Sequence, residues 1–185
     1  MRAQATFALL IAALLLVVPA QAGTITDFTG PYAPGNWTFT NTPSGTSGSL
    51  NTSGAPASIT LISGNSGVAG NTDLLISALG TGTWSFSWSY STADWDWGWD
   101  PAYYGLNGSY TALHGSGSAN LSIAAGDVIG YRIGTSDGSF GSGSLTIRDF
   151  AAPDDTAVPE PSTLSLLALG AAGLLVYRLR QRPVR

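Results

Sequence analysis

The stretch that decides the fold is Trp84-Ser85-Phe86-Ser87-Trp88-Ser89-Tyr90, in which a large aromatic residue alternates with serine. Successive side chains of a β-strand point to opposite faces, so this alternation places the four aromatic rings on one face and the three serines on the other. The stretch therefore predicts a β-strand with one buried face and one face of small polar side chains.

Similar short runs, rich in β-branched and aromatic residues, recur between clusters of Gly, Asn, Asp and Ser throughout residues 23–157. This pattern is typical of an all-β sandwich of two packed antiparallel sheets. We expect about ten short strands, over Thr24–Phe28, Trp37–Asn41, Ala57–Ser63, Asp73–Leu79, Thr83–Ser91, Tyr103–Leu106, Ser109–Leu113, Ala119–Ile123, Val128–Ile133 and Leu145–Phe150. Asn107-Gly108 predicts a type I′ hairpin, because both central residues must accept positive φ. Disorder is the alternative for the Gly- and Ser-rich stretches 40–55 and 64–70.

The composition excludes several classes of function. The chain of 185 residues has no cysteine and one histidine. A disulfide scaffold, a Cys-based zinc site, a thiol nucleophile and a polyhistidine metal centre are therefore excluded. Residues 23–157 hold ten Asp and two Arg, a formal charge of −8, and the whole chain has no lysine. An acidic segment without a basic patch argues against nucleic-acid binding.

The first 22 residues have the three parts of a secretory signal peptide. Arg2 is followed by an apolar stretch over residues 7–18, and then by Ala20 and Ala22 in an A-x-A cleavage site. We expect the Sec translocon to export the chain and signal peptidase to cleave it after Ala22. An N-terminal membrane anchor is the alternative, but the apolar stretch is short for a membrane span.

The last 28 residues contain Pro159, Glu160 and Pro161, an apolar stretch and a basic tail. We expect a transmembrane helix over residues 164–180. The arginines in its last turn and after it act as a stop-transfer signal that stays cytoplasmic: Arg178, Arg180, Arg182 and Arg185. The two prolines keep their segment extended, so that Glu160, the only glutamate in the chain, becomes a charged handle for a protease. A rigid Pro-rich linker is the alternative.

The domain organisation follows from these segments. We expect a signal peptide over residues 1–22, a β-sandwich domain over 23–152, a Pro-rich linker with the Pro-Glu-Pro motif over 153–163, the transmembrane helix over 164–180 and a basic cytoplasmic tail over 181–185.

The C-terminal 28 residues resemble the PEP-CTERM sorting signal, in which a Pro-Glu-Pro motif precedes a membrane helix and a basic tail. The resemblance implies that exosortase, a membrane-embedded cysteine protease or transpeptidase of Gram-negative bacteria that produce exopolysaccharide, processes the chain. It also implies that the C-terminal helix holds the chain transiently in the inner membrane, before the protein reaches the cell-envelope surface or the exterior.

The middle segment resembles a passenger domain that recurs among PEP-CTERM proteins. The residues that carry this resemblance are 28–32, 36–38, 88–92, 100–108 and 145–150. The resemblance implies a jelly-roll-like sandwich with no established activity.

Three carboxylates, of Asp94, Asp96 and Asp100, lie within seven residues around Gly98. Ca²⁺ takes six to eight oxygen ligands, so this loop is a candidate calcium site, although its spacing is not that of an EF-hand. Asp137 is a remote fourth ligand if the fold brings it there. The alternative is a solvated acidic turn, in which aspartates cap and form the turn.

The same loop carries Trp95, Trp97 and Trp99. An exposed row of indoles would stack on sugar rings, and the neighbouring tyrosines 103, 104 and 110 could extend it. The alternative is packing into the core, which large aromatic residues usually dominate, or an aromatic cluster that anchors the loop. The exposure of the three indoles distinguishes the two.

The sequence lacks the residue patterns of three kinds of catalytic site: a catalytic triad, a two-carboxylate glycosidase site and a nucleotide-binding loop. His114 has no G-x-S-x-G elbow nearby, and the aspartate cluster lies on one short loop instead of across a cleft. No G-x-G extends into a nucleotide-binding loop.

We therefore predict a non-enzymatic surface or extracellular-matrix protein that is structural or adhesive in exopolysaccharide or biofilm. The alternative is a calcium-assisted carbohydrate-binding module on the same sandwich.

Overall fold

The computed structural model describes residues 23–155 and, near the C-terminus, residues 169–170, 173–174 and 177, which are helical. Residues 22–155 form a compact unit by themselves. The predicted cleavage site at Ala20 and Ala22, the Pro-Glu-Pro motif and the four C-terminal arginines lie outside the described residues, as does most of the helix predicted over 164–180. Within the described residues, no helix is long and apolar enough to cross a membrane.

Residues 23–155 form eleven strands and two short 3-10 helices. The strands are β1 (Thr24–Thr26), β2 (Thr38–Thr42), β3 (Ser49–Asn51), β4 (Ser58–Ile62), β5 (Gly70–Ser77), β6 (Gly82–Thr92), β7 (Ala102–Leu106), β8 (Ser109–Leu113), β9 (Ser116–Ile123), β10 (Val128–Thr135) and β11 (Gly143–Pro153). The 3-10 helices are η1 (Gly30–Tyr32) and η2 (Pro34–Asn36). Ten strands overlap the predicted ranges. The eleventh, β3, was not predicted and lies within residues 40–55, where disorder was the alternative.

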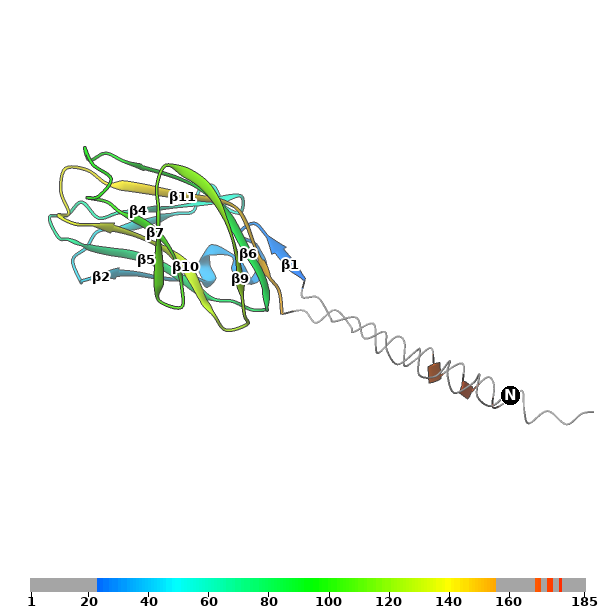
Figure 1. The fold of residues 1–185 in the computed structure, drawn as a ribbon. Helices are drawn as coiled ribbons and strands as arrows, with labels where there is room; N and C mark the ends of the chain where they lie inside the picture. Colours follow the sequence, from blue (N-terminus) through cyan, green and yellow to red (C-terminus); the bar gives the residue numbers. More distant parts are fainter. Residues whose placement is uncertain (1–22, 156–168, 171–172, 175–176, 178–185) are drawn as a thin grey trace, which may run out of the picture. The chain divides into compact units, whose positions relative to one another are not determined.

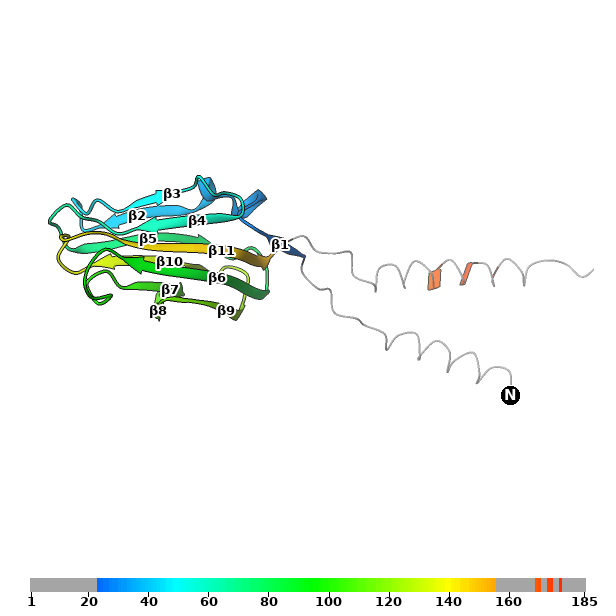
Figure 2. The same cartoon turned by 90° about the horizontal axis from the view of Figure 1, so that it is seen from above.

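The strands form an antiparallel β-sandwich, and the predicted fold class is confirmed. One sheet has the order β3-β4-β11-β6-β9, with β1 paired to β11, and the other has the order β2-β5-β10-β7-β8. Figures 1 and 2 show the two layers from directions at right angles. The pairing of β6 with β11 shifts between Arg148 and Ala151, and past this irregularity β11 pairs with β1.

The aromatic strand β6 lies between β11 and β9. Trp84 and Phe86 are almost completely buried, while Trp88 and Tyr90 pack against the same core from partly buried positions. The serines between them face away from the core, since neighbouring side chains alternate. The alternation predicted from the sequence is thus confirmed.

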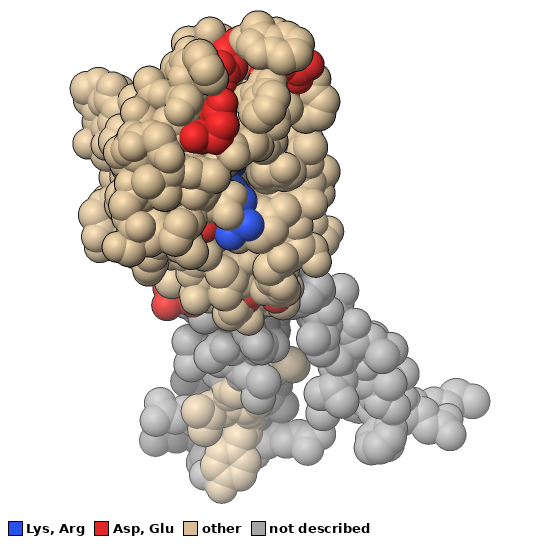
Figure 3. All heavy atoms as spheres, turned by 90° about the vertical axis from the view of Figure 1, so that its left-hand side faces the viewer, with Lys and Arg blue, Asp and Glu red and all other residues tan. Residues whose placement is uncertain are grey.

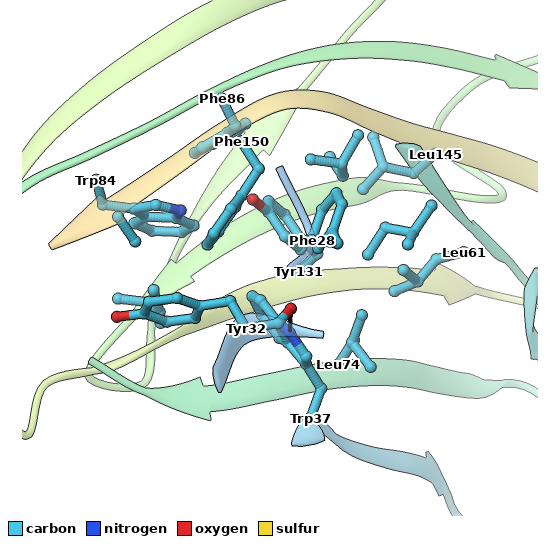
Figure 4. Packing of buried hydrophobic residues seen from close by; sticks show 14 of the residues in the cluster. Phe28, Tyr32, Trp37, Leu61, Leu74, Trp84, Phe86, Tyr131, Leu145 and Phe150 are labelled. Atoms are coloured by element: carbon cyan, nitrogen blue, oxygen red, sulfur yellow. Dashed lines mark hydrogen bonds between the residues drawn. The ribbon is translucent and has the colours of Figure 1, made fainter. Parts of the chain in front are cut away.

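The core between the sheets is rich in stacked and tilted aromatic rings (Figure 4). Phe28 stacks on Phe150 with ring centroids 4.8 Å apart, and Trp37 stacks on Tyr131 at 5.9 Å. The buried Tyr32 hydroxyl donates to the carbonyl of Pro153 and accepts from the backbone of Leu79, both at 3.0 Å. Segments 30 to 37 and 150 to 153 are thereby tied together, which closes the core at the end where the chain enters and leaves the sandwich.

At that end Asp154 N donates to Gly23 O (2.8 Å), so the first and last described residues of the sandwich lie side by side. The predicted hairpin is confirmed here, because Asn107 and Gly108 have φ of 50° and 80°. Asn107 Nδ2 also donates to Asp127 Oδ1 (2.9 Å), which joins the hairpin to the turn before β10.

Three loops gather at the opposite end, and we call them the tip: residues 63–69, 93–101 and 136–142 (left in Figure 1). Ser136 N donates to Trp99 O (2.7 Å), and Gly67 N donates to Gly138 O (2.6 Å). These bonds connect each loop of the tip to a neighbour that is far away in sequence.

Candidate functional site

The loop of residues 93–101 is anchored by Asp100, which is completely buried. Its Oδ1 accepts a hydrogen bond from Ser63 Oγ (2.8 Å), and its Oδ2 accepts one from Thr92 Oγ1 (2.7 Å). Ser63 Oγ in turn accepts from Gly143 N (2.8 Å). The Asp100 carboxylate therefore ties the loop to Ser63 of the tip and to the end of β6, and both of its oxygens already have neutral protein partners.

Tyr90 supports the same anchor from β6. Its hydroxyl donates to the backbone carbonyl of Asp100 (2.8 Å). Burial, followed by the negative charge of Asp100, raises the pKa of Tyr90 to about 12. The hydroxyl therefore stays protonated at neutral pH and keeps its role as a donor.

The other two aspartates of the loop have different surroundings. Asp96 is exposed, and its Oδ1 accepts from Gly98 N (2.7 Å) in the way aspartates form turns. Asp94 Oδ2 is buried and has no hydrogen-bond partner. Burial raises the pKa of Asp94, and the nearby charges of Asp100 and Asp137 raise it further. Asp137, named from the sequence as a remote ligand, is thus close enough to act on Asp94.

The side chains predicted to bind calcium are not arranged around a common site in the described structure. No group of three or more His, Asp or Glu side chains is placed to hold a metal ion in the part of the chain that the structure describes. Asp100 turns inward to Ser63 and Thr92, and Asp96 bonds to its own turn. Of the three predicted ligands, Asp94 alone has a buried oxygen without a hydrogen-bond partner.

The three tryptophans of the loop are all exposed, by 84% for Trp95, 51% for Trp97 and 37% for Trp99. They do not form one row. Trp95 and Trp99 make a tilted pair with ring centroids 6.5 Å apart. Trp97 instead forms a T-shaped contact with His114, with ring centroids 4.0 Å apart. The alternative in which these indoles pack into the core is therefore wrong. Sugar binding itself stays a prediction.

Trp97 and His114 border a small surface pocket of about 220 Å³, which Tyr90 and Gly115 complete. The pocket joins the loop after β6 to the turn between β8 and β9. Its ring faces and hydroxyl suit a group with one apolar and one polar side. His114, the one imidazole of the chain, thus serves as a pocket wall.

Phe140 is an aromatic residue of the tip that the sequence analysis missed. Its side chain is 84% exposed, and its φ of 66° is rare for a bulky residue. The available signal was a single phenylalanine inside the run Gly138-Ser139-Phe140-Gly141, where no strand pattern buries it. With the three tryptophans, Phe140 gives the tip four exposed large aromatic side chains.

The nearby tyrosines do not extend the indoles, and this correction follows from the strand register. Tyr104 faces the core, where its ring contacts Trp84 and Phe86. Tyr103 and Tyr110 make an edge contact on the other face of that sheet, and the Arg132 guanidinium lies 3.9 Å from the Tyr110 ring centroid. They belong to a separate cluster of the outer sheet face.

The charge of the tip is negative. Figure 3, which looks onto this end, shows most of the acidic surface in its upper part and a small basic surface near its centre. Among the described residues, one side-chain ion pair forms, between Arg132 Nε and Asp73 Oδ1 (2.7 Å). None reaches Asp94, Asp96 or Asp137, so the described tip keeps an uncompensated negative charge around its indoles.

A family model described as the PEP-CTERM protein-sorting motif matches residues 157–181. The chain therefore carries this motif at its C-terminus, as predicted, and the motif implies exosortase processing and export to the cell envelope. No enzyme family was found, and no curated protein matches the chain.

Several solved structures are similar to the sandwich at low identity and with TM-scores below 0.5. A mutant family 29 carbohydrate-binding module complexed with cellulohexaose has a TM-score of 0.41 and 10% identity, covering 72% of this chain and 92% of that one. The family 11 module of a cellulosomal cellulase from Clostridium thermocellum has a TM-score of 0.41 and 7% identity, covering 74% and 96%. A family 35 module from Clostridium thermocellum has a TM-score of 0.36 and 15% identity, covering 68% and 98%. Likenesses this distant do not identify a ligand for this chain.

Proposed function

We propose that this chain, which carries the PEP-CTERM sorting motif over residues 157–181, is a non-enzymatic adhesive protein of the envelope surface or extracellular matrix. Exosortase processes it after Sec-dependent export, and the sandwich then attaches to exopolysaccharide through the tip. This proposal combines the sorting signal with the surface chemistry of the domain that it carries.

The observation that supports adhesion most directly is the exposure of Trp95, Trp97, Trp99 and Phe140 at one end of the sandwich. Large exposed apolar groups that lie together mark binding surfaces. Covering about 100 Å² of an indole contributes about 2.5 kcal/mol at 25 cal/mol per Å². Two stacked sugar rings would therefore supply enough free energy for weak but specific attachment.

The negative charge of the tip favours a neutral polysaccharide over an anionic one. Asp94, Asp96 and Asp137 lie among the exposed rings without an ion pair in the described structure. An anionic sugar would be repelled by these carboxylates, whereas a neutral one would not. We therefore expect neutral exopolysaccharide to be the preferred ligand.

The position of the tip suits this role. The described sandwich ends at Asp155, beside Gly23, and the tip lies at the opposite end. The sorting segment consequently leaves the sandwich far from the exposed rings.

Sugar binding is tested on the full chain with Trp95→Ala and Trp97→Ala, measured by retention on an immobilised neutral glucan and by tryptophan fluorescence. Phe39→Ala is the matched control, because Phe39 is an aromatic residue of β2 that is 38% exposed outside the tip. We expect at least tenfold weaker retention for the tip variants and no loss of retention for the control. Equal retention of all three variants would reject the tip as the binding surface.

Sorting is tested by Glu160→Ala in the exporting cell. We expect the unprocessed chain to accumulate in the membrane fraction, because the sole glutamate of the chain is the charged handle of the proposed processing site. Pro34→Ala is a control outside the motif. Unchanged size and location of the Glu160 variant would contradict the proposed processing.

Calcium assistance remains the second candidate, supported by the buried, unpartnered Oδ2 of Asp94. Burial, and after it the negative charges of Asp100 and Asp137, raise the pKa of Asp94, and a cation bound there would offset both effects. Since a ligand of the folded state alone must raise stability, excess Ca²⁺ would raise the melting temperature relative to chelator. Identical melting curves would remove calcium from the proposal.

A further inference from the structure

The strand β9 is an edge strand. It pairs with β6 in an unbroken register, from Ser116 opposite Ser89 to Ile123 opposite Gly82. No strand of the described residues pairs with its other side. An edge of eight residues presents a row of backbone N–H and C=O groups that another strand can use.

β9 lacks the features that usually prevent an edge strand from pairing with another chain. Natural edges carry Lys or another charge, proline, or a bulge that twists the strand away. The sequence of β9, Ser-Gly-Ser-Ala-Asn-Leu-Ser-Ile, has no charge and no proline, and its register has no shift. The other edge strands, β2, β3 and β8, are also uncharged but have three or five residues, so β9 is the longest uncharged edge at which two copies, each with −8 over residues 23–157, can approach.

The two faces of β9 differ clearly. Gly117, Ala119, Leu121 and Ile123 lie on the core side, where Ile123 is 4% exposed and Ala119 and Leu121 pack against the core from partly buried positions. The alternate residues, Ser116, Ser118, Asn120 and Ser122, are exposed. A partner strand must match this alternation, because a slip of one residue would place apolar side chains on the polar face.

We propose that two copies of this chain pair through β9 in an antiparallel, two-fold symmetric arrangement centred on Asn120. This register places Ala119 opposite Leu121 and Gly117 opposite Ile123, so every core-side residue of the strand meets a core-side residue of the other copy. It places Asn120 opposite Asn120 on the polar face. A self-complementary strand pairing of this kind closes as a dimer and leaves no further β9 edge.

The pairing has a consequence for attachment. β9 begins next to the turn of His114, which contacts Trp97 of the tip. Antiparallel pairing reverses the direction of one copy, so the two tips point in opposite directions. A dimer would thus bind two polysaccharide strands at once and cross-link a matrix, with the avidity of a bivalent ligand.

The register is tested by oxidative cross-linking of the full chain, which has no native cysteine to interfere. Residues directly opposite in an antiparallel pair have Cα atoms about 4.5–5.5 Å apart, within the range of a disulfide. We expect Asn120→Cys to form a disulfide-linked dimer on a non-reducing gel. Ser49→Cys is the matched control, because Ser49 is also an exposed residue of an edge strand, β3.

A second variant tests the interface without a new covalent bond. Asn120→Lys would place two like charges opposite each other, and we expect the dimer dissociation constant to rise at least about tenfold in analytical ultracentrifugation. Ser49→Lys should leave it unchanged. The proposal fails if Asn120→Cys stays monomeric under oxidation, or if both cysteine variants cross-link equally. Trp95→Ala should still dimerise, so failure of sugar binding and failure of pairing are distinguishable.

Discussion

Replacing Asp100 by alanine distinguishes an anchor of the tip from a calcium ligand. The carboxylate is completely buried and accepts hydrogen bonds from Ser63 and Thr92. Alanine removes both acceptors and leaves two hydroxyls without their partner. If Asp100 is an anchor, the variant should lose stability whether or not calcium is present.

The magnitude follows from these two bonds. A hydrogen bond to a charged group contributes about 1.5–3 kcal/mol, so the loss of both lowers the free energy of unfolding by about 3–6 kcal/mol. Domains have about 5–15 kcal/mol of stability in total. For a domain of this size, such a loss lowers the melting temperature by about 10–20 °C.

The assay is thermal and urea unfolding of the full chain, followed by tryptophan fluorescence in chelator and in excess Ca²⁺. Asp96→Ala is the control, because Asp96 is an exposed aspartate of the same loop that bonds to its own turn. We expect it to change stability by less than about 1 kcal/mol. A loss below about 1 kcal/mol for Asp100→Ala, or a loss seen in calcium alone, would refute the anchor role.

Three further variants test other parts of the sandwich. Arg132→Ala should lower the free energy of unfolding by about 3–5 kcal/mol in urea, because Asp73 is 4% exposed and would lose its bidentate partner; full stability would show that Asp73 does not need this charge. Asp94→Asn should raise the melting temperature at pH 7. The folded pKa of Asp94 is raised above 3.8, so its contribution to stability is complete below that pH and is lost as the pH rises through the folded pKa. The variant should therefore flatten the pH dependence of melting above 3.8, and an unchanged profile would contradict the raised pKa of Asp94. Gly130→Ala should cost about 1–3 kcal/mol, since its Cβ would collide with the backbone of β5, whereas Gly35→Ala, with open space around it, should be nearly neutral by the same melting assay.

The elements that sequence reasoning recovered are those with a local signal. The alternation in residues 84–90 needs no partner to be recognised, because a strand divides its own side chains between two faces. Asn107-Gly108 likewise encodes its turn through its own backbone preferences. In contrast, β3 has three residues and exists through its pairing with β4, so its sequence carries no recognisable period.

The candidate site was recovered in part. The loop of residues 93–101 was named from its density of Asp and Trp, and its indoles are exposed as sugar binding requires. The different fates of Asp94, Asp96 and Asp100 could not be predicted, since three aspartates in one loop look alike. Asp100 is distinguished by Ser63, which lies 37 residues away in the chain.

The tyrosines and Phe140 show the same limit. Tyr103 and Tyr104 are neighbours in sequence, yet β7 sends one to the outer face and the other into the core. Phe140 joins the tip because Ser136 bonds to Trp99, which brings the loop of residues 136–142 beside the loop of residues 93–101. No pattern within either loop predicts that contact.

The sequence by itself determined the all-β class, the face that β6 buries, the acidic character of residues 23–157 and the sorting motif, because each is written in the identity and spacing of neighbouring residues. The tertiary structure alone decided which aspartate anchors the tip, which aromatic rings remain exposed and which strands lie at the sheet edges. Burial and pairing depend on the distance between residues far apart in the chain. That distance is set when the two sheets pack.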